Sequence, residues 1–261
     1  TRTLVNDLAP VASALFEDEE SRRLFADAKG NIVAEGAKVI QLDLADTLAR
    51  IRENGGVGLY RGKLAAALVA GVRAAGGTLA LEDLKDFAPR WLEPVKFKVG
   101  NRSAFFFPTP AAGGIVLGQM IGMLDIEDSF DGAPEDARLH LLAEAGMRAF
   151  AERQGWMTDE YKSRVPLAKL LGKARLQKLV STFSNQKHTL PHSFNPKPAP
   201  RPENPSATSF VVLDQNGSAV ACVLTMNNRF GIGRIAKGTG VMLAAVSNNL
   251  GRGPISMGPM I

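Results

Sequence analysis

A pair of apolar runs on either side of a short polar turn constrains the fold more than any other feature. The runs are residues 210–213 and 220–224, and the turn DQNG lies between them. An Asn-Gly pair between two β-prone runs predicts an antiparallel hairpin. Both runs are continuously apolar, which is typical of strands covered on both faces. We therefore expect two adjacent antiparallel strands in the middle of a sheet.

The segment before this hairpin is rich in proline. Residues 195–205 read NPKPAPRPENP, in which five of eleven residues are proline, and this composition favours an extended tether outside any core. The strand after it opens on Ser206, Ala207, Thr208 and Ser209. Hydroxyl residues commonly begin strands and cap turns, so this can be an ordinary loop entering a hairpin. Alternatively, the chain is cut here and a hydroxyl becomes a nucleophile.

The remaining segments predict a chain that is mostly helical before the tether. Apolar spacing and terminal glycines predict helices over residues 11–28, 42–54, 62–75, 134–154 and 167–183, a short helix from Thr78 or Leu81, and two strands around Gly100-Asn101. The turn PTPAAGG at residues 108–114 also enters a helix. Its spacing fits neither common phosphate-binding glycine pattern, so we expect a packing turn rather than an anion site.

Composition excludes several classes of function. The single cysteine, Cys222, allows no intramolecular disulfide, and His140, His188 and His192 share no metal-ligand spacing. The net charge of +5 comes without a nucleic-acid-binding motif, so we expect no nucleic-acid partner. No apolar run approaches the roughly 18 residues of a membrane span. The first residues, TRTLVNDLAP, are typical of an internal sequence, so we expect a fragment or a processed product, and no compartment follows from them.

Several stretches, taken in order, resemble the gamma-glutamyltranspeptidase family. LYRGKLAAALV with AAGGTLALEDLKDF is similar to the family's tyrosine-glycine helix and the segment after it, and PTPAAGG is similar to its PPPSSGG loop. AFAERQGWMTD resembles its Ala-Asp-Arg helix. SFVVLDQNGSAVACVLTMNNRFG resembles the stretch after its catalytic threonine, and GPISMGPMI resembles its serine–methionine–proline loop. The resemblance runs from about Leu42 to the end of the chain and covers only the middle of a family member.

The resemblance implies a fold and a division of the chain. The fold is α/β, a four-layer αββα sandwich of the N-terminal-nucleophile hydrolase type. Residues 1–194 would be the C-terminal, mostly helical part of the large-subunit region, 195–206 a processing tether, and 207–261 the start of the small-subunit region with strands of the central sheet. The precursor would cut itself before a threonine, whose hydroxyl becomes the nucleophile and whose new α-amine serves as general base.

The family's motif at the cut is Thr-Thr-His-aromatic-Ser-Val-Val-Asp. Aligned without gaps on Asp214, its first threonine falls on Ala207, its second on Thr208 and its histidine on Ser209. Alanine has no nucleophile, which leaves three interpretations. The scissile bond is Ala207–Thr208, with the strand start shifted by one residue; or Ala207 is an engineered replacement that traps the uncut precursor; or the protein is a natural homologue that no longer reacts.

The interpretation that we pursue is an amide hydrolase or acyltransferase acting through a threonine ester. The resemblance implies Thr208 as nucleophile, Thr225 as its orienter and Asn227 as a substrate contact, with Ser256 and Gly258 lining the pocket. It implies no metal and no organic cofactor. The partners would be a small amide or γ-glutamyl-like substrate and, after processing, the two subunits of one precursor. The alternative is a catalytically inactive homologue or an unprocessed precursor with a binding or structural role.

One departure from the family concerns its substrate's α-amine. The family holds that amine with an Asn-Asn-Gln-x-Asp-Asp run after the position of Gly240. This chain has Leu243, Ala244, Ala245, Val246 and Ser247 there, without a carboxylate. An ammonium group buried without a counter-charge would cost several kcal/mol. We therefore expect an acyl substrate that lacks the glutamyl amine or that binds it through other groups.

Overall fold

The computed structural model describes residues 1–126, 129–158, 162–184, 187–194 and 207–246. This part of the chain forms two compact units. The first unit combines Thr1–Arg90 with Met226–Val246, and the second combines residues 91–194 with Ala207–Thr225. The expected tether, residues 195–205, lies outside the described residues. None of the helices in the described ranges is long and apolar enough to cross a membrane.

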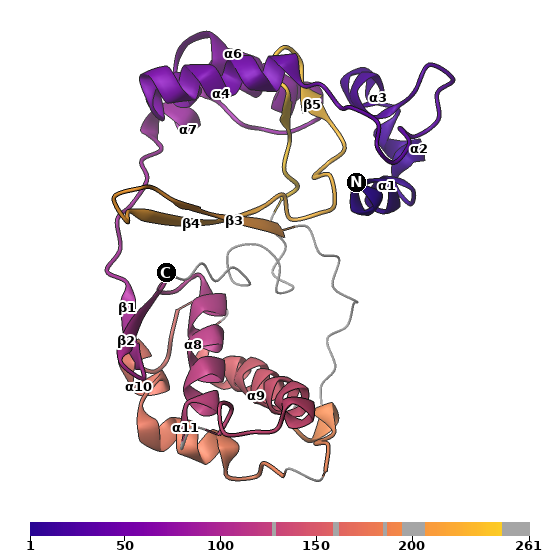
Figure 1. Ribbon diagram of the computed structural model, residues 1–261. Helices are drawn as coiled ribbons and strands as arrows, with labels where there is room; N and C mark the ends of the chain where they lie inside the picture. Colours follow the sequence, from indigo (N-terminus) through magenta and orange to yellow (C-terminus); the bar gives the residue numbers. More distant parts are fainter. Residues whose placement is uncertain (127–128, 159–161, 185–186, 195–206, 247–261) are drawn as a thin grey trace. The chain divides into compact units, whose positions relative to one another are not determined.

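The first unit is built from helices and one very short hairpin (Figure 1). Its elements are α1 (Arg2–Leu8), α2 (Ala12–Leu15), α3 (Glu19–Phe25), α4 (Leu42–Asn54), α5 (Val57–Tyr60), α6 (Gly62–Ala74), α7 (Leu81–Asp86), β5 (Ile235–Ala236) and β6 (Val241–Met242). The predicted helices over 42–54 and 62–75 are confirmed as α4 and α6, and the short helix from Leu81 as α7. The predicted helix over 11–28 is instead two helices, because Asp18 caps a new helix, α3, in its middle.

Glycines end the two longest helices of this unit as expected. Gly55 follows α4 with φ of 63°, and Gly76 lies just after α6 with φ of 86°. Both angles lie in the left-handed region, which glycine adopts without a Cβ clash. The unit has two small cores, one around Leu8, Leu15 and Phe25, the other around Leu68, Ala236 and Leu243.

The second unit combines helices with two separate hairpins. Its elements are β1 (Val95–Val99), β2 (Arg102–Phe106), α8 (Ala112–Leu124), α9 (Glu135–Trp156), α10 (Leu167–Leu170), α11 (Lys173–Val180), the 3-10 turn η2 (Pro191–Ser193), β3 (Ala207–Leu213) and β4 (Ala219–Thr225). The strands predicted around Gly100-Asn101 are confirmed as β1 and β2. Helix α8 contacts this hairpin and packs against α9, α10 and α11.

A stripe of small residues lets α8 approach its neighbours closely. A Cβ on Gly114 would lie 3.1 Å from Phe106 Cβ, and one on Gly122 would lie 2.6 Å from Leu176 Cδ1 and 2.8 Å from Phe97 Cζ. Between them, Gly118 faces Leu171 and Phe106 at similar distances. The glycine-rich turn into α8 therefore begins a packing surface, as the sequence predicts.

The single helix predicted over residues 167–183 is wrong. The chain forms α10 and α11 with a break at Gly172, whose φ of −70° and ψ of 140° are extended rather than helical. Gly172 becomes the N-cap residue of α11, and the N–H groups of Arg175 and Leu176 donate to its carbonyl. Glycine is a poor residue for a helix interior, which explains why the helix breaks there.

The hairpin of β3 and β4 is present, but the described residues do not cover both of its faces. The two strands pair with each other alone among the described residues, as a two-stranded antiparallel sheet. All of β3 is exposed, with Leu213 69% and Phe210 49% accessible. A continuously apolar strand is expected to be buried by other parts of the protein. Its sequence does not show whether the described residues bury it. The described chain is a mixed α/β structure with three two-stranded sheets.

Candidate active site

A hydrogen-bonded polar turn closes the hairpin that carries the candidate nucleophile. Asp214 Oδ1 accepts hydrogen bonds from the backbone N–H groups of Asn216 and Ser218, each at 2.8 Å. The Asp214 backbone N–H in turn donates to the Ser218 carbonyl at 3.0 Å. The hydrogen bonds from Ser218 and then Asn216 lower the pKa of the Asp214 carboxyl, because they favour its charged form. Gly217, with φ of 84°, closes the turn.

The register that follows from this turn decides which side chains share a face. Leu213 lies opposite Ala219, and counting back along both strands places Thr208 opposite Leu224 and Ala207 opposite Thr225. Directly opposed residues project to the same face of an antiparallel pair, and neighbours along a strand project to opposite faces. Thr225 therefore shares its face with Ala207, and Thr208 lies on the other face.

The structure thus brings both candidate catalytic residues into one hairpin but not onto one face. This register agrees with the gap-free alignment, in which Ala207 occupies the place of the family's first threonine. It could have been read from the sequence, because the turn residues fix the strand pairing and the pairing fixes the face.

The candidate substrate contact Asn227 lies just after β4, in the first unit. Its φ is 62°, and its side-chain Nδ2 donates to the Ala245 carbonyl at 2.8 Å. The Ala245 N–H donates to the Met226 carbonyl at 3.0 Å. Asn227 therefore ties the segment after β4 to the segment after β6. The other two predicted site residues, Ser256 and Gly258, lie outside the described residues.

Leu243, the first residue of the stretch that the resemblance aligns with an acidic run, serves packing. Leu243 is 7% exposed and packs with Leu68 and Ala236. It also extends the short β5–β6 ladder, since its N–H donates to the Arg234 carbonyl at 2.9 Å and its carbonyl accepts from the Ile232 N–H at 3.0 Å. This part of the segment is therefore a piece of the apolar core and offers no anion to an ammonium group.

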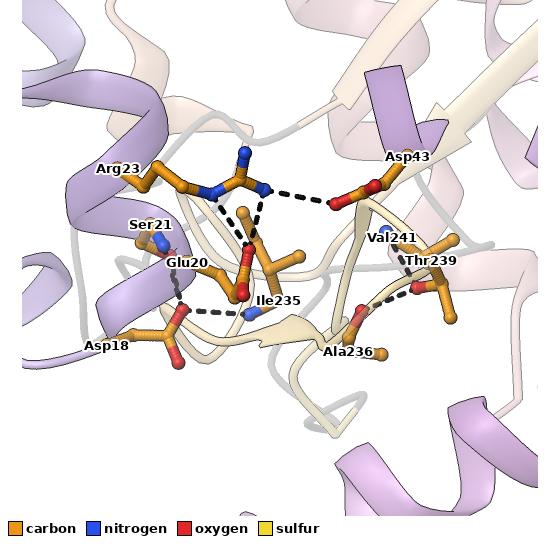
Figure 2. A network of polar contacts seen from close by, with 9 residues as sticks. All are labelled: Asp18, Glu20, Ser21, Arg23, Asp43, Ile235, Ala236, Thr239 and Val241. Atoms are coloured by element: carbon orange, nitrogen blue, oxygen red, sulfur yellow. Dashed lines mark hydrogen bonds and ion pairs between the residues drawn. The ribbon is translucent and has the colours of Figure 1, made fainter. Parts of the chain in front are cut away.

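A polar network holds the β5–β6 hairpin on the N-terminal helices (Figure 2). Asp18 Oδ2 accepts from the backbone N–H and the hydroxyl of Ser21, at 3.0 and 2.9 Å, and so caps α3. The same oxygen accepts from the backbone N–H of Ile235 in β5 at 3.2 Å. Beside it, Arg23 Nη2 contacts Glu20 at 2.7 Å and Asp43 at 3.0 Å, which links α3 to α4.

Thr239 is a second residue that anchors the β5–β6 hairpin, in addition to Asp18. It is fully buried, and its hydroxyl donates to the Ala236 carbonyl at 2.7 Å and accepts from the Val241 N–H at 3.0 Å (Figure 2). The Thr47 hydroxyl of α4 donates to the Thr239 carbonyl at 2.7 Å. The sequence alone does not reveal these anchors, because pairs some 190 to 220 residues apart leave no local pattern. The cap signal at Asp18 was readable, but its bond to Ile235 was not.

The candidate catalytic residues of this hairpin offer hydroxyl groups. No cluster of three or more histidine, cysteine or carboxylate side chains within the described residues has a geometry suited to a metal ion. Thr208, Ser209 and Thr225 supply hydroxyls within one hairpin whose turn is rigidly bonded. A hydroxyl becomes a useful nucleophile when a base lies beside it, and the α-amine of a newly cut chain can be that base.

The chain is similar to known proteins over most of its length. Residues 1–253 match the family model described as gamma-glutamyltranspeptidase. The chain is 34% identical over 237 residues to a glutathione hydrolase proenzyme of Pseudomonas aeruginosa, covering 89% of this chain and 41% of that protein. It is 30% identical over 218 residues to an acylase ACY 1 proenzyme of Pseudomonas sp. strain V22, covering 82% of this chain and 38% of that protein. The chain thus spans about two-fifths of the length of these relatives.

Solved structures agree with the sequence relatives. The crystal structure of Helicobacter pylori gamma-glutamyltranspeptidase aligns with a TM-score of 0.60 at 26% identity, over 73% of this chain and 55% of that one. Cephalosporin acylase from Bacillus halodurans aligns with a TM-score of 0.66 at 22% identity, over 92% of this chain and 42% of that one, which shows a likeness of fold. With the family model matched over nearly the whole length, the chain belongs to the gamma-glutamyltranspeptidase family.

Proposed function

We propose that the chain is the processing region of an amide hydrolase or acyltransferase that acts through an N-terminal threonine. The observation that carries the proposal is the position of Thr208. It is the first hydroxyl residue of β3, and β3 begins at Ala207 directly after the proline-rich segment. Relatives of the chain are named proenzymes, which supports activation by a cut in the chain. A cut between Ala207 and Thr208 would make Thr208 the first residue of the new chain.

The chemistry then needs only Thr208 and a substrate amide. The α-amine of Thr208 takes the proton from its own hydroxyl, and the oxygen attacks the amide carbon. The C–N bond breaks, the leaving amine takes the proton, and the acyl group remains as an ester on Thr208. Water or an acceptor amine then attacks the ester, which frees the threonine.

Thr225 acquires its proposed role as orienter only after the cut. In the paired hairpin, Thr208 and Thr225 lie on opposite faces. The backbone on the N-terminal side of Thr208 is lost on cleavage. Rotation about its Cα–C bond can then turn the side chain into the place that the amine held in the intact strand. The hydroxyl can thereby reach the face of Thr225, which it cannot reach in the intact strand.

The substrate class follows from the segment after β6. Buried Leu243 and the bonded Ala245 occupy the place of the family's acidic run, so an α-ammonium would have no counter-charge there. The preferred acyl group is one without an α-amine, and the acylase relatives support this class. Asn227 would contact the acyl group, and Ser256 and Gly258 would line the pocket.

The wider architecture is part of the same proposal. The complete fold would be the four-layer αββα sandwich. The chain would divide into a large-subunit part (residues 1–194), a tether (195–206) and the start of a small subunit (207–261). In that fold further strands and a covering layer would bury β3 and β4. The apolar residues of β3, together with Val220 and Leu224 of β4, are exposed in the described chain.

The register favours a second candidate, an unprocessed protein without turnover. The residue that shares a face with Thr225 is Ala207, which has no hydroxyl. If the reactive position is 207 and not 208, the chain can neither cut itself nor form an ester. The protein would then bind a small amide without changing it.

Paired substrates test the proposed activity. Glutaryl p-nitroanilide and γ-glutamyl p-nitroanilide differ only in the α-amine, and we expect the glutaryl compound to be turned over at least tenfold faster. Thr208→Ala should abolish turnover. Ser209→Ala should lower it by less than about tenfold, the effect of a lost hydrogen bond worth about 1 kcal/mol. Turnover that survives Thr208→Ala would refute the role of Thr208, and a faster γ-glutamyl reaction would refute the substrate class.

A further inference from the structure

A cavity in the second unit borders a strongly basic stretch of the chain. Residues 161–202 contain nine lysines and arginines and no aspartate or glutamate. Helix α11 belongs to this stretch and lines the cavity together with α9 (Figure 1). The cavity has a volume of about 360 Å³, within the range of pockets that hold small organic ligands. None of the candidate active-site residues in the described chain takes part in the lining.

Two ion pairs of this lining are already neutral. Glu152 is the carboxylate of the lining, and both of its oxygens are engaged, because Arg175 pairs with Oε1 and Gln119 Nε2 donates to Oε2 at 2.9 Å. Arg148 pairs with Glu144, and both side chains are buried. Neither pair gives the cavity a net charge.

Lys178 supplies the net charge of the lining. It is exposed in the last turn of α11, and none of the ion pairs between described residues includes it. The end of the helix is bonded without its ammonium group, since the Lys178 carbonyl accepts from the Ser181 hydroxyl at 2.8 Å. The carbonyl of Val180 likewise accepts from the backbone N–H of Phe183 at 2.8 Å. The cavity therefore carries one unmatched positive charge, which favours an anion.

Thr182 adds a hydrogen-bond donor to the same lining. It is exposed, and its Oγ1 accepts from Arg148 Nη2 at 3.3 Å. A hydroxyl that accepts in this way keeps its own proton to donate, and this proton is used in no hydrogen bond among the described residues. Lys178 and Thr182 thus offer a cation and a hydroxyl donor, which can bind a carboxylate through charge-assisted hydrogen bonds. Leu179 and Phe194 give the lining an apolar part.

We propose that this cavity binds a small organic monocarboxylate. The carboxylate lies between the ammonium group of Lys178 and the hydroxyl of Thr182, and the apolar part of the ligand lies against Leu179 and Phe194. A single negative charge suits the site, because Lys178 is the one lining cation without a counter-charge among the described residues. The site is separate from the hairpin chemistry and does not depend on cleavage of the chain.

Three probes test the chemistry of the ligand. Benzoate has the carboxylate and an apolar ring, benzamide has the same shape without the charge, and acetate has the charge without the ring. Binding is followed by the NMR signals of the Leu179 and Thr182 backbone amides in the 261-residue chain. We expect benzoate to shift both signals at millimolar concentration or below, and the other two probes to bind at least tenfold more weakly. Equal binding of benzamide would overturn the carboxylate, and equal binding of acetate would overturn the apolar contact.

A matched pair of lysines in α11 tests the place. Lys178→Gln removes a charge from the lining, whereas Lys173→Gln removes the same charge from an exposed position of the helix outside the lining. Benzoate binding should weaken at least tenfold in Lys178→Gln and less than twofold in Lys173→Gln. It should also weaken in Thr182→Val but not in Thr182→Ser, which keeps the hydroxyl. Equal effects of the two lysine substitutions would show attraction to the basic surface as a whole and would overturn the proposal, as would the absence of saturable benzoate binding.

Discussion

At the scale of single residues, a shift of one position along β3 decides whether a hydroxyl group can lie on the face of Thr225. Thr208 and Ala207 are neighbours, yet the register places only Ala207 on the face of Thr225. A nucleophile at 208 therefore requires a cut that frees its backbone, whereas position 207 faces Thr225 in the intact strand and lacks a hydroxyl.

The buried carboxylate of Glu144 leads to a prediction about acid stability. Burial alone would raise its pKa, but hydrogen bonds from Thr189 and the ion pair with Arg148 lower it from 4.5 to about 2. A lowered folded-state pKa stabilises the fold above the unfolded-state value, and this stability is lost as the pH falls from about 4.5 to about 2. This shift in pKa corresponds to a contribution on the order of 3 kcal/mol to the free energy of unfolding at neutral pH.

Urea unfolding of Glu144→Gln between pH 7 and pH 2.5 measures this contribution. At pH 7 the variant should lose about 3–5 kcal/mol, because Arg148 is left buried without its counter-charge. Its stability should also fall less steeply in acid than that of the parent. Asp46→Asn, which removes an exposed pair with Arg50, should change the stability by less than about 1 kcal/mol. An unchanged acid slope in Glu144→Gln would contradict the assignment.

At the scale of elements, two glycines in the β5–β6 turn provide a matched test of docking. Gly238 and Gly240 both have positive φ, at 71° and 66°. A Cβ on Gly238 would meet nothing within 4 Å, but one on Gly240 would lie 2.4 Å from the backbone nitrogen of Leu44 in α4. Both alanine variants carry the same kind of backbone strain, so their difference isolates the contact between the turn and α4.

We expect Gly240→Ala to be destabilised by about 1–3 kcal/mol more than Gly238→Ala, the usual cost of overpacking. Thermal unfolding of the two variants, followed by circular dichroism, gives the comparison. Equal midpoints would show that the turn does not rest on α4 as described.

The elements differ in how far the sequence could predict them. The ends of α4 and α6 can be predicted from the sequence, because a terminal glycine acts on the helix that it follows. The β3–β4 hairpin can also be predicted, because its turn residues act locally. The break at Gly172 was missed because the apolar spacing continues across it. The described residues do not supply the expected cover of β3, because an apolar run does not tell which residues bury it. The contacts of Asp18 with Ile235 and of Thr47 with Thr239 depend on tertiary packing alone.

At the scale of the whole molecule, the first unit joins the two ends of the described chain. Met226–Val246 packs with Thr1–Arg90 through the core around Leu243 and through the anchors Asp18 and Thr239. A cut before β3 therefore leaves the C-terminal piece bound to the N-terminal helices, because separation would expose this core to water.

Cleavage at an inserted protease site after Glu203 tests this association. The two pieces should elute together in gel filtration and separate only in denaturant. Leu243→Asp should release the C-terminal piece, whereas Val246→Asp, at a position 91% exposed, should not. Separate elution of the unmodified pieces would contradict the packing of the first unit.

The role of Thr208 as nucleophile is tested by the mass and N-terminal sequence of the pieces that the purified protein forms by itself. We expect self-cleavage between Ala207 and Thr208, a small fragment that begins at Thr208, and an intact chain in Thr208→Ala. The variant Ala207→Thr distinguishes between positions 207 and 208 as the place of the nucleophile. An intact parent chain, together with an Ala207→Thr chain that cuts itself before residue 207, would contradict Thr208 as the nucleophile and establish the unprocessed alternative.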